Sequence, residues 1–406
     1  MNVDDVVLPT GLRVQVVRRP SVPVVRARLQ LPRCSRTPID TAATELLAAE
    51  VAVARTPCAR RVRRAGGQVV AWVTAERLSV DGHAPAHALT DLLARVAEVA
   101  RPGTAPSGLG QVRDELARRL ARAPRDPSAA AADALNRLRF DDHPALRPPD
   151  AGALARLRPG DVEAAARGLL RPGGAVLVVV GDLDPAEAVE RVRAAFGDWR
   201  ADGPAQQLAL PPARESEQGL HLVGEDSALL RLVTGAPGRD DPAEGAFQLA
   251  TLVLGGFFSS RLVRRLRHRS GMAYSVHAGP DALAATRSVT LDVRVRAADV
   301  PAAMRAVRDE LSRFAAGGPA PTELAAARRY ALGQFAAAGA TQAALVEGLA
   351  VLATQQLDTG WPDRHAERLE TATADQVAAA AHRIGTATWS HALVGGRPGS
   401  HVEGAA

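Results

Sequence analysis

The sequence has no lysine, so all of its 50 basic residues are arginines. Aromatic residues make up only 3% of the 406 residues, and there are two cysteines, Cys34 and Cys58. With so few aromatic rings, we expect cores built mainly from small aliphatic side chains. The two cysteines form no C-x-x-C pair and no disulfide framework, which indicates a reducing compartment.

Charge and hydropathy exclude two classes of partner. The formal net charge of +6 is small for this length, and no basic stripe alternates with aromatic residues, so we expect no nucleic-acid partner. The densest basic run, Arg60–Arg64, is interpreted as the solvated face of a helix end. No apolar run approaches the length of a membrane span, and acidic residues follow Met1 where a signal peptide needs positive charge. We therefore expect no membrane partner and a cytoplasmic location.

The chain reads as two related halves, each with alternating strands and long amphipathic helices. We predict a domain at 1–200, a linker rich in proline, glutamine and alanine at 201–216, and a second domain at 217–406. The mixture of elements favours an α+β fold in which each domain has a mostly antiparallel sheet with helices packed on one face.

The predicted elements follow the period of the apolar residues and the glycine and proline breaks. In the first half we expect strands at 12–17, 24–31, 68–74, 78–82 and 175–182, and helices at 41–54, 86–99, 109–120, 127–139, 162–170 and 185–196. In the second half we expect strands at 229–235, 288–295 and 390–395, and helices at 242–254, 300–315, 321–336 and 374–384.

The stretch 254–275 is the most informative part of the chain. It reads as a helix end, the glycine pair Gly255-Gly256, a basic helix, and a strand entry at Tyr274. Four other motifs occur earlier in the chain: Gly11-Leu-Arg-Val, Gly66-Gly-Gln-Val-Val-Ala, His143-Pro-Ala-Leu-Arg-Pro and Val178-Val-Val-Gly-Asp. In their order and spacing, these motifs resemble the pitrilysin-like (M16, inverzincin) metallopeptidases over nearly the whole chain.

The resemblance implies site residues in both halves. Arg267 and Tyr274 match the pair that orients substrate carbonyls across the cavity from the zinc ion. Val69, Val70 and Ala71 match the strand whose edge binds the peptide, with Val70 in place of the usual Asn. Outside the resemblance, a surface arginine and a tyrosine at the edge of the core are the simpler interpretation of Arg267 and Tyr274.

The zinc motif of that family is absent. Active members carry His-x-x-Glu-His on the first helix, where two His bind zinc and the Glu is the base. Aligned on Leu46-Leu47, this chain has Glu45, Ala48 and Ala49 at those three positions, and Glu115 is the nearest match to the distal ligand. Alanine can neither bind a metal nor accept a proton, so we expect no metal site and no cofactor in this chain. Glu45 and Glu115 are interpreted as ordinary helix carboxylates.

Several other motifs have simple structural interpretations. His83 and His87 have the i, i+4 spacing of a helical metal pair, but Pro85 lies between them, which favours histidines at a helix start. His143, before a proline, is expected to make a backbone hydrogen bond in a loop. The glycine pairs at 66–67 and 255–256 lack the P-loop lysine and match no phosphate-binding motif.

Some peptidases of this family divide their site between two chains, one with the zinc helix and one with the Arg and Tyr. The sequence favours the second kind: a non-catalytic subunit that binds peptide by strand addition, inactive alone, whose partner is a homologous chain with an intact His-x-x-Glu-His helix and the zinc ion. Two alternatives stay open. One is a purely structural homologue, and the other is an active homodimer with unusual metal ligands.

Overall fold

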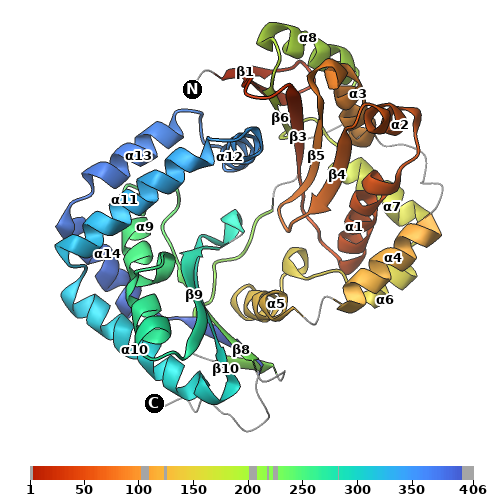
Figure 1. Cartoon of the computed structure of the whole chain (residues 1–406). Helices are drawn as coiled ribbons and strands as arrows, with labels where there is room; N and C mark the ends of the chain where they lie inside the picture. The colour runs from red at the N-terminus through yellow and green to blue at the C-terminus, as the bar shows by residue number, and fades with distance from the viewer. Residues whose placement is uncertain are drawn as a thin grey trace. The chain divides into compact units, whose positions relative to one another are not determined.

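The computed structural model describes residues 3–101, 109–122, 126–200, 208–216, 219–222, 227–281 and 283–395. The chain divides into two compact units, each with its own β-sheet and helices (Figure 1). Unit 1 comprises residues 1–121, 147–209 and 337–361, and unit 2 comprises 122–146, 210–336 and 362–406. The mixed helix and sheet content confirms the predicted α+β class.

The sheet of unit 1 has six strands in the order β1-β2-β6-β3-β5-β4. Only the β2–β6 pair is parallel, and the other neighbours are antiparallel. The strand β6 is buried along its whole length because it lies inside the sheet with helices on both faces. The strands are β1 (Asp4–Val7), β2 (Arg13–Arg18), β3 (Val24–Pro32), β4 (Gln68–Val73), β5 (Arg77–Pro85) and β6 (Val176–Gly181).

Several helices of unit 1 begin where a side chain caps free backbone N–H groups. Thr37 and Asp40 form a capping box at the start of α1, and Asp184 caps α8. The helices are α1 (Pro38–Val53), α2 (Pro57–Arg64), α3 (Leu89–Ala100), α4 (Leu109–Arg122), α6 (Ala151–Arg156), α7 (Pro159–Leu169), α8 (Pro185–Phe196) and α12 (Gln342–Thr354).

The sheet of unit 2 repeats the pattern of unit 1. Its order is β7-β11-β8-β10-β9, and only β7–β11 is parallel, so each strand corresponds to one in the series β2-β6-β3-β5-β4. This correspondence supports the predicted relation between the two halves of the chain. The strands are β7 (Gly219–Leu222), β8 (Ser227–Gly235), β9 (Ala273–Pro280), β10 (Ser288–Arg296) and β11 (Ser390–Val394).

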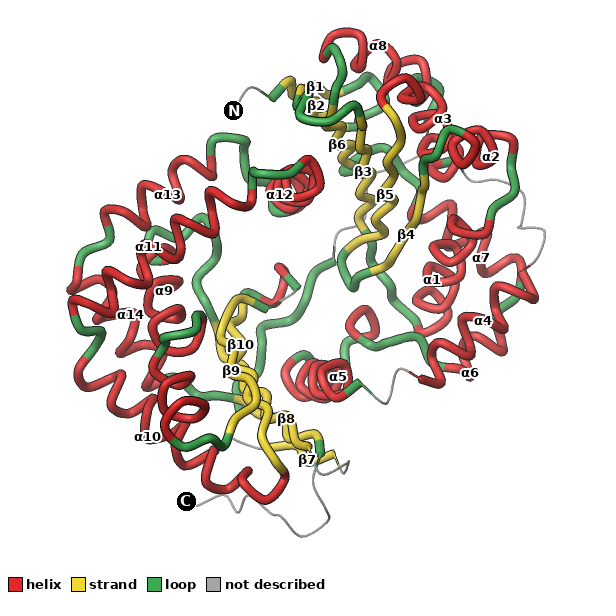
Figure 2. Tube along the Cα trace, in the orientation of Figure 1, coloured by secondary structure: helices red, strands yellow, loops and turns green. Residues whose placement is uncertain are grey.

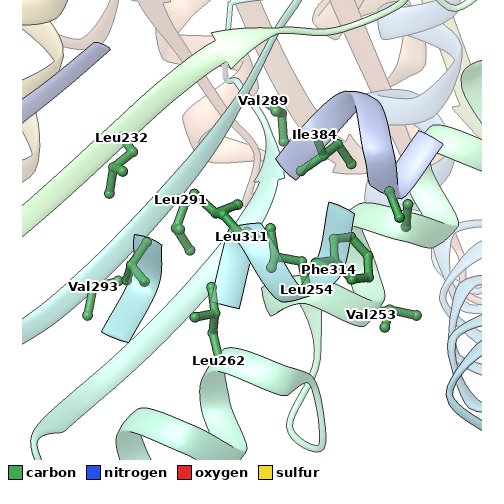
Figure 3. Packing of buried hydrophobic residues seen from close by; sticks show 14 of the residues in the cluster. Leu232, Val253, Leu254, Leu262, Val289, Leu291, Val293, Leu311, Phe314 and Ile384 are labelled. Atoms are coloured by element: carbon green, nitrogen blue, oxygen red, sulfur yellow. The ribbon is translucent and has the colours of Figure 1, made fainter. Parts of the chain in front are cut away.

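The main core of unit 2 is aliphatic, as the composition predicts. Figure 3 shows Leu254 and Leu262 packed near Leu291 of β10, together with Phe314 and Ile384 from the covering helices. The helices of this unit are α5 (Pro127–Arg139), α9 (Glu244–Thr251), α10 (Val300–Gly317), α11 (Pro321–Ala338), α13 (Trp361–Thr371) and α14 (Ala374–Thr386). Two π-helical segments, η4 (Leu252–Gly256) and η5 (Val263–Arg269), follow α9.

Each unit also contains one helix from the opposite half of the chain. Helix α12 packs Leu345, Val346 and Leu349 against Val178 and Val180 of β6, and α5 packs against β8 and β11 of unit 2 (Figure 2). Both faces of each sheet are therefore covered, whereas the sequence predicted helices on one face. The expected boundaries at 1–200 and 217–406 place α5 in the first domain and α12 in the second. In the structure α5 belongs to unit 2 and α12 to unit 1, because the apolar face of each helix packs against the sheet of that unit.

Most predicted elements lie within a few residues of the observed ones, and α5 and α8 have the predicted bounds. The predicted elements did not include β1, α6, β7, α12 or α13, and α2 was expected only as the helix end at Arg60–Arg64. In the predicted linker, residues 208–216 have no helix or strand, and residues 201–207 lie outside the described residues. Among the described residues, no helix is long and apolar enough by itself to cross a membrane; α11 and α12 reach that length only as a pair, with a 105° bend between them.

Candidate functional site

The predicted Arg267 lies on the π-helical segment η5, which contacts the edge strand β9. The backbone N–H of Ser270 donates to the carbonyl of Arg265 at 3.3 Å, so the last turn has the i→i−5 spacing of a π-helix. Helical turns of this kind are rare in proteins and frequently occur at functional sites. The π-helical turn therefore agrees with a functional role for the residues around Arg267.

The glycine pair allows the preceding helix end to approach β9 closely. A Cβ atom on Gly255 would lie 2.9 Å from the Cβ of Ala278 on β9, and one on Gly256 would lie 2.6 Å from a side-chain carbon of Leu252. Both distances are too short for a larger residue without movement of its neighbours. The pair thus has a packing role, in line with the interpretation that it is no phosphate cradle.

Arg267 is exposed at the surface of unit 2. Its guanidinium carbon lies 5.8 Å from the ring centroid of Phe258, and the His268 ring lies 4.6 Å from the same ring. Phe258 itself is 70% exposed. Within the described residues, no carboxylate pairs with Arg267, so its charge remains available to a ligand.

The neighbouring arginines differ, because carboxylates neutralise them. Arg261 and Arg264 bind Glu323 of α11 at 2.6 and 2.5 Å, and Arg265 binds Asp309 of α10 at 2.9 Å. Although burial raises the pKa of Glu323, the hydrogen bonds from Arg261, Arg264 and a backbone N–H hold its pKa below the usual value. The first three arginines of the basic segment are thus bound in ion pairs. Only residues 267–269 present positive charge to solvent without a carboxylate partner among the described residues.

Tyr274 occupies a β-bulge at the start of β9. Ser275 pairs with Arg294 of β10 and Ala273 pairs with Val295, so Tyr274 has no partner on the adjacent strand. A bulge redirects a side chain and increases the local twist. The Tyr274 side chain is 62% exposed. Tyr274 and Arg267 therefore lie on two elements in contact, and both side chains reach solvent.

The predicted strand-addition residues lie on β4, the last strand of the unit 1 sheet. Val69 faces the core, whereas Val70 and Ala71 are half-buried. β4 pairs with β5 on one side, and no described strand pairs with its other side. The free backbone groups of such an edge can accept an added strand. In the repeat, β4 corresponds to β9, so the segment Val69–Ala71 and Tyr274 lie on corresponding edge strands.

The position of the family's zinc site contains arginine next to the remaining carboxylate. Glu45 of α1 binds Arg119 of α4 at 3.0 Å, and Glu115 binds Arg118 at 2.6 Å with its side chain 72% exposed. Burial raises the pKa of Glu45, while the charges of Arg119 and Arg33 lower it. Leu46 of α1 and Leu116 of α4 belong to the same buried apolar cluster.

The residues at this position do not fit a zinc ion. Ala48, at the place of the base, is 3% exposed and packs in the core, and Ala49 offers only a methyl group. The buried Arg33 donates to Thr41 and to the carbonyl of Thr74, which places a cation close to Glu45. In the described part of the chain, no three His, Cys, Asp or Glu residues form a group able to hold a metal.

The remaining histidine and arginine motifs have structural surroundings. His83 is on β5 and His87 is in the 3-10 turn Ala86–Ala88, so they do not share a helix. The His143 ring accepts a hydrogen bond from the backbone N–H of Ala145 at 3.3 Å, as expected for a loop residue. The arginines of the run Arg60–Arg64 are exposed on α2. The sequence did not single out Phe258 as a site residue. No local pattern indicates that this phenylalanine is exposed beside the basic segment.

A family model described as the Peptidase M16 inactive domain matches residues 156–330, which include Arg267 and Tyr274. An uncharacterized zinc protease of Streptomyces coelicolor is 30% identical over 160 residues, which are 38% of this chain and 35% of that protein. The chain thus aligns with only about a third of that relative. An uncharacterized zinc protease of Mycobacterium leprae is 25% identical over 83% of this chain and 77% of its own length.

Solved structures share the fold. A Pseudomonas fluorescens structure described as a peptidase M16 inactive domain has a TM-score of 0.86, with 20% identity and 98% of both chains covered. A chain in the structure of complex III2 from Candida albicans has a TM-score of 0.82, with 13% identity, covering 97% of this chain and 96% of that one. At these identities the likeness shows the fold alone. Taken with the family model over residues 156–330 and the zinc-protease relatives, it shows that the chain is similar to the M16 peptidases.

Proposed function

We propose that this chain is the zinc-less subunit of a heterodimeric M16-type metallopeptidase, an inverzincin whose metal belongs to a homologous partner. The partner would carry the intact His-x-x-Glu-His helix. The single observation that carries the proposal is the contrast between two positions of this chain. Glu45 is occupied by arginine contacts where the metal would be, while Arg267 and Tyr274 are both exposed on adjoining elements.

The peptide would bind in an extended form along the free edge of β4, at Val69, Val70 and Ala71. Main-chain hydrogen bonds give affinity there with little demand on sequence. The role of Arg267 and Tyr274 is to donate hydrogen bonds to the carbonyl oxygen of the peptide bond that is cleaved. A guanidinium and a phenol suit this role because their hydrogen bonds strengthen as the oxygen gains negative charge.

The test is a reconstitution with a homologous chain that has the intact zinc helix, for instance one encoded by a neighbouring reading frame. We expect neither this chain nor its Arg267→Ala variant to cleave peptide alone, and the wild-type pair to cleave it. The Arg267→Ala pair should form with unchanged affinity but lose about a hundredfold in kcat, as for loss of one donor to an oxyanion. Tyr274→Phe, which removes only the hydroxyl, should lose less.

The matched control is Arg60→Ala, which removes an exposed arginine from α2 of unit 1. It should leave turnover of the pair unchanged. Full activity of the Arg267→Ala pair would remove the site assignment, and a failure of any zinc-bearing homologue to restore cleavage would remove the proposed subunit role. We place the complex in the cytoplasm, which the two free cysteines support.

A second function is favoured by the likeness to a chain of complex III2. The chain would then be a structural component of an assembly, without a part in proteolysis. This alternative predicts that Arg267→Ala and Tyr274→Phe leave every function of the chain unchanged. Co-purification of the tagged chain, followed by peptide cleavage assays on the recovered complex, distinguishes the two functions.

A further inference from the structure

The surface around Phe258 has an unusual charge composition. Residues 245–280 contain no Asp or Glu, although they include five arginines and two histidines. The three arginines nearest the start of the basic segment are neutralised by carboxylates of α10 and α11. The remaining residues, Arg267, His268 and Arg269, are all exposed, and no carboxylate pairs with them within the described residues.

Phe258 connects this charge to an exposed ring. The guanidinium carbon of Arg267 lies 5.8 Å from its ring centroid and the His268 ring lies 4.6 Å from it, so two nitrogen-containing groups lie beside the ring. A cation at a helix C-terminus is stabilised by the helix dipole, which accounts for arginines at this position. The dipole does not account for a phenylalanine that is 70% exposed beside them. Aromatic residues, including Phe, and arginines are enriched at protein interfaces.

We propose that Phe258, His268 and Arg269, together with Arg267, form a subsite that selects acidic residues of the bound polypeptide. The inference rests on the proposed function and names its substrate class: extended peptides with Asp or Glu close to the segment held by the Arg267–Tyr274 pair. Charge complementarity supports the proposal, since Arg267 and Arg269 are exposed and have no carboxylate partner among the described residues. The aliphatic part of a glutamate side chain packs against the Phe258 ring while its carboxylate meets the arginines.

The test uses the full chain and three fluorescent decapeptides that differ only in a central residue, Glu, Gln or Lys. Binding is measured by anisotropy at low and moderate salt. We expect the Glu peptide to bind about three- to tenfold more tightly than the Gln peptide, as one or two exposed ion pairs give, and the Lys peptide to bind most weakly. Added salt should reduce the difference because it screens exposed charges.

Variants locate the selectivity on this surface. Arg269→Ala and Phe258→Ala should each lower the ratio of Glu to Gln affinity toward one, while the affinity for the Gln peptide stays within about twofold because backbone pairing is retained. Arg60→Ala, on α2 of unit 1, should leave the ratio unchanged. Circular dichroism of each variant shows whether its fold is intact, and Arg269, which is exposed, serves as the variant least able to disturb folding.

Each outcome decides between the two proposals. Equal binding of the three peptides overturns the acidic subsite and leaves strand addition in place, whereas no binding of any peptide overturns both. A ratio lowered as much by Arg60→Ala as by Arg269→Ala shows that general charge, and not this surface, is responsible. Binding of a single-stranded oligonucleotide that depends on Arg269 and displaces the Glu peptide also contradicts the proposal, because the surface would then recognise phosphate.

Discussion

Arg231 and Asp292 lie opposite each other at the centres of β8 and β10, and their side chains form two hydrogen bonds of 2.7 and 2.6 Å. The same relationship occurs between Arg28 and Asp81 at the centres of β3 and β5 in unit 1, at 2.7 Å. Each arginine also contacts the helix that comes from the other half of the chain. Arg231 donates to the carbonyl of Ser128 in α5, and Arg28 binds Glu347 of α12.

The two pairs differ in what remains when the aspartate is removed. Asp292→Asn should destabilise unit 2 by about 2 kcal/mol, because the largely buried Arg231 then loses its paired carboxylate and keeps only neutral oxygen acceptors. Asp81→Asn should cost about 1 kcal/mol, since Arg28 keeps Glu347. Hydrogen exchange of β8 and β3 amides measures each loss. Equal losses would contradict the part assigned to Glu347.

Helix α12 belongs to the C-terminal half in sequence but completes the core of unit 1. Leu349→Ala should therefore destabilise the unit 1 sheet by about 2–4 kcal/mol, the usual loss for a leucine buried in a core. Hydrogen exchange should show β6 losing protection, while β10 keeps it. The matched control, Leu324→Ala, removes a leucine from the unit 2 core and should have the opposite pattern. Loss of protection in the unit 2 sheet of the Leu349→Ala variant would contradict the assignment of α12 to unit 1.

Restoring the zinc motif alone should not restore a metal site. The triple variant Glu45→His, Ala48→Glu and Ala49→His places a carboxylate in the apolar core at position 48 and a histidine beside Arg119. We expect it to be less stable than the natural protein and to bind no stoichiometric zinc in equilibrium dialysis. Adding Arg119→Ala tests the contribution of that arginine. Tight zinc binding by the triple variant alone would show that the arginines do not oppose the metal.

Glu50, on α1, predicts a pH dependence of stability. Burial raises its pKa from 4.5 to about 7, so the folded protein holds a proton that the unfolded chain releases near pH 4.5. The free energy of unfolding should therefore fall as pH rises from 4.5 to 7 and stay lower above it. Because the side chain is half-exposed, Glu50→Gln should raise the free energy of unfolding by only about 1 kcal/mol at pH 8, and should change it little at pH 4. Denaturation curves at the two pH values measure it; the same change at both pH values would contradict this account.

Local sequence signals account for the elements that were predicted well. Asp126 and Asp184 each precede a proline at a helix start, and their side chains cap α5 and α8, which begin and end where expected. The strands β3 and β8 follow their runs of apolar residues. In the candidate site, the glycine pair and the basic segment were visible in the sequence because they are contiguous. The short edge strands β1 and β7 were missed because four residues give no usable period.

The sequence by itself determined the α+β class, the related halves, the aliphatic cores and the absence of the zinc motif, with Ala48 in place of the base and Ala49 in place of a ligand, because each depends on residue type or local period. The tertiary structure decided the rest. It assigned α5 and α12 to the units opposite their sequence neighbours, placed Arg119 against Glu45, and put Tyr274 in a bulge. Those features depend on which surfaces bury each other over long sequence separations, and no local pattern of residues specifies that choice.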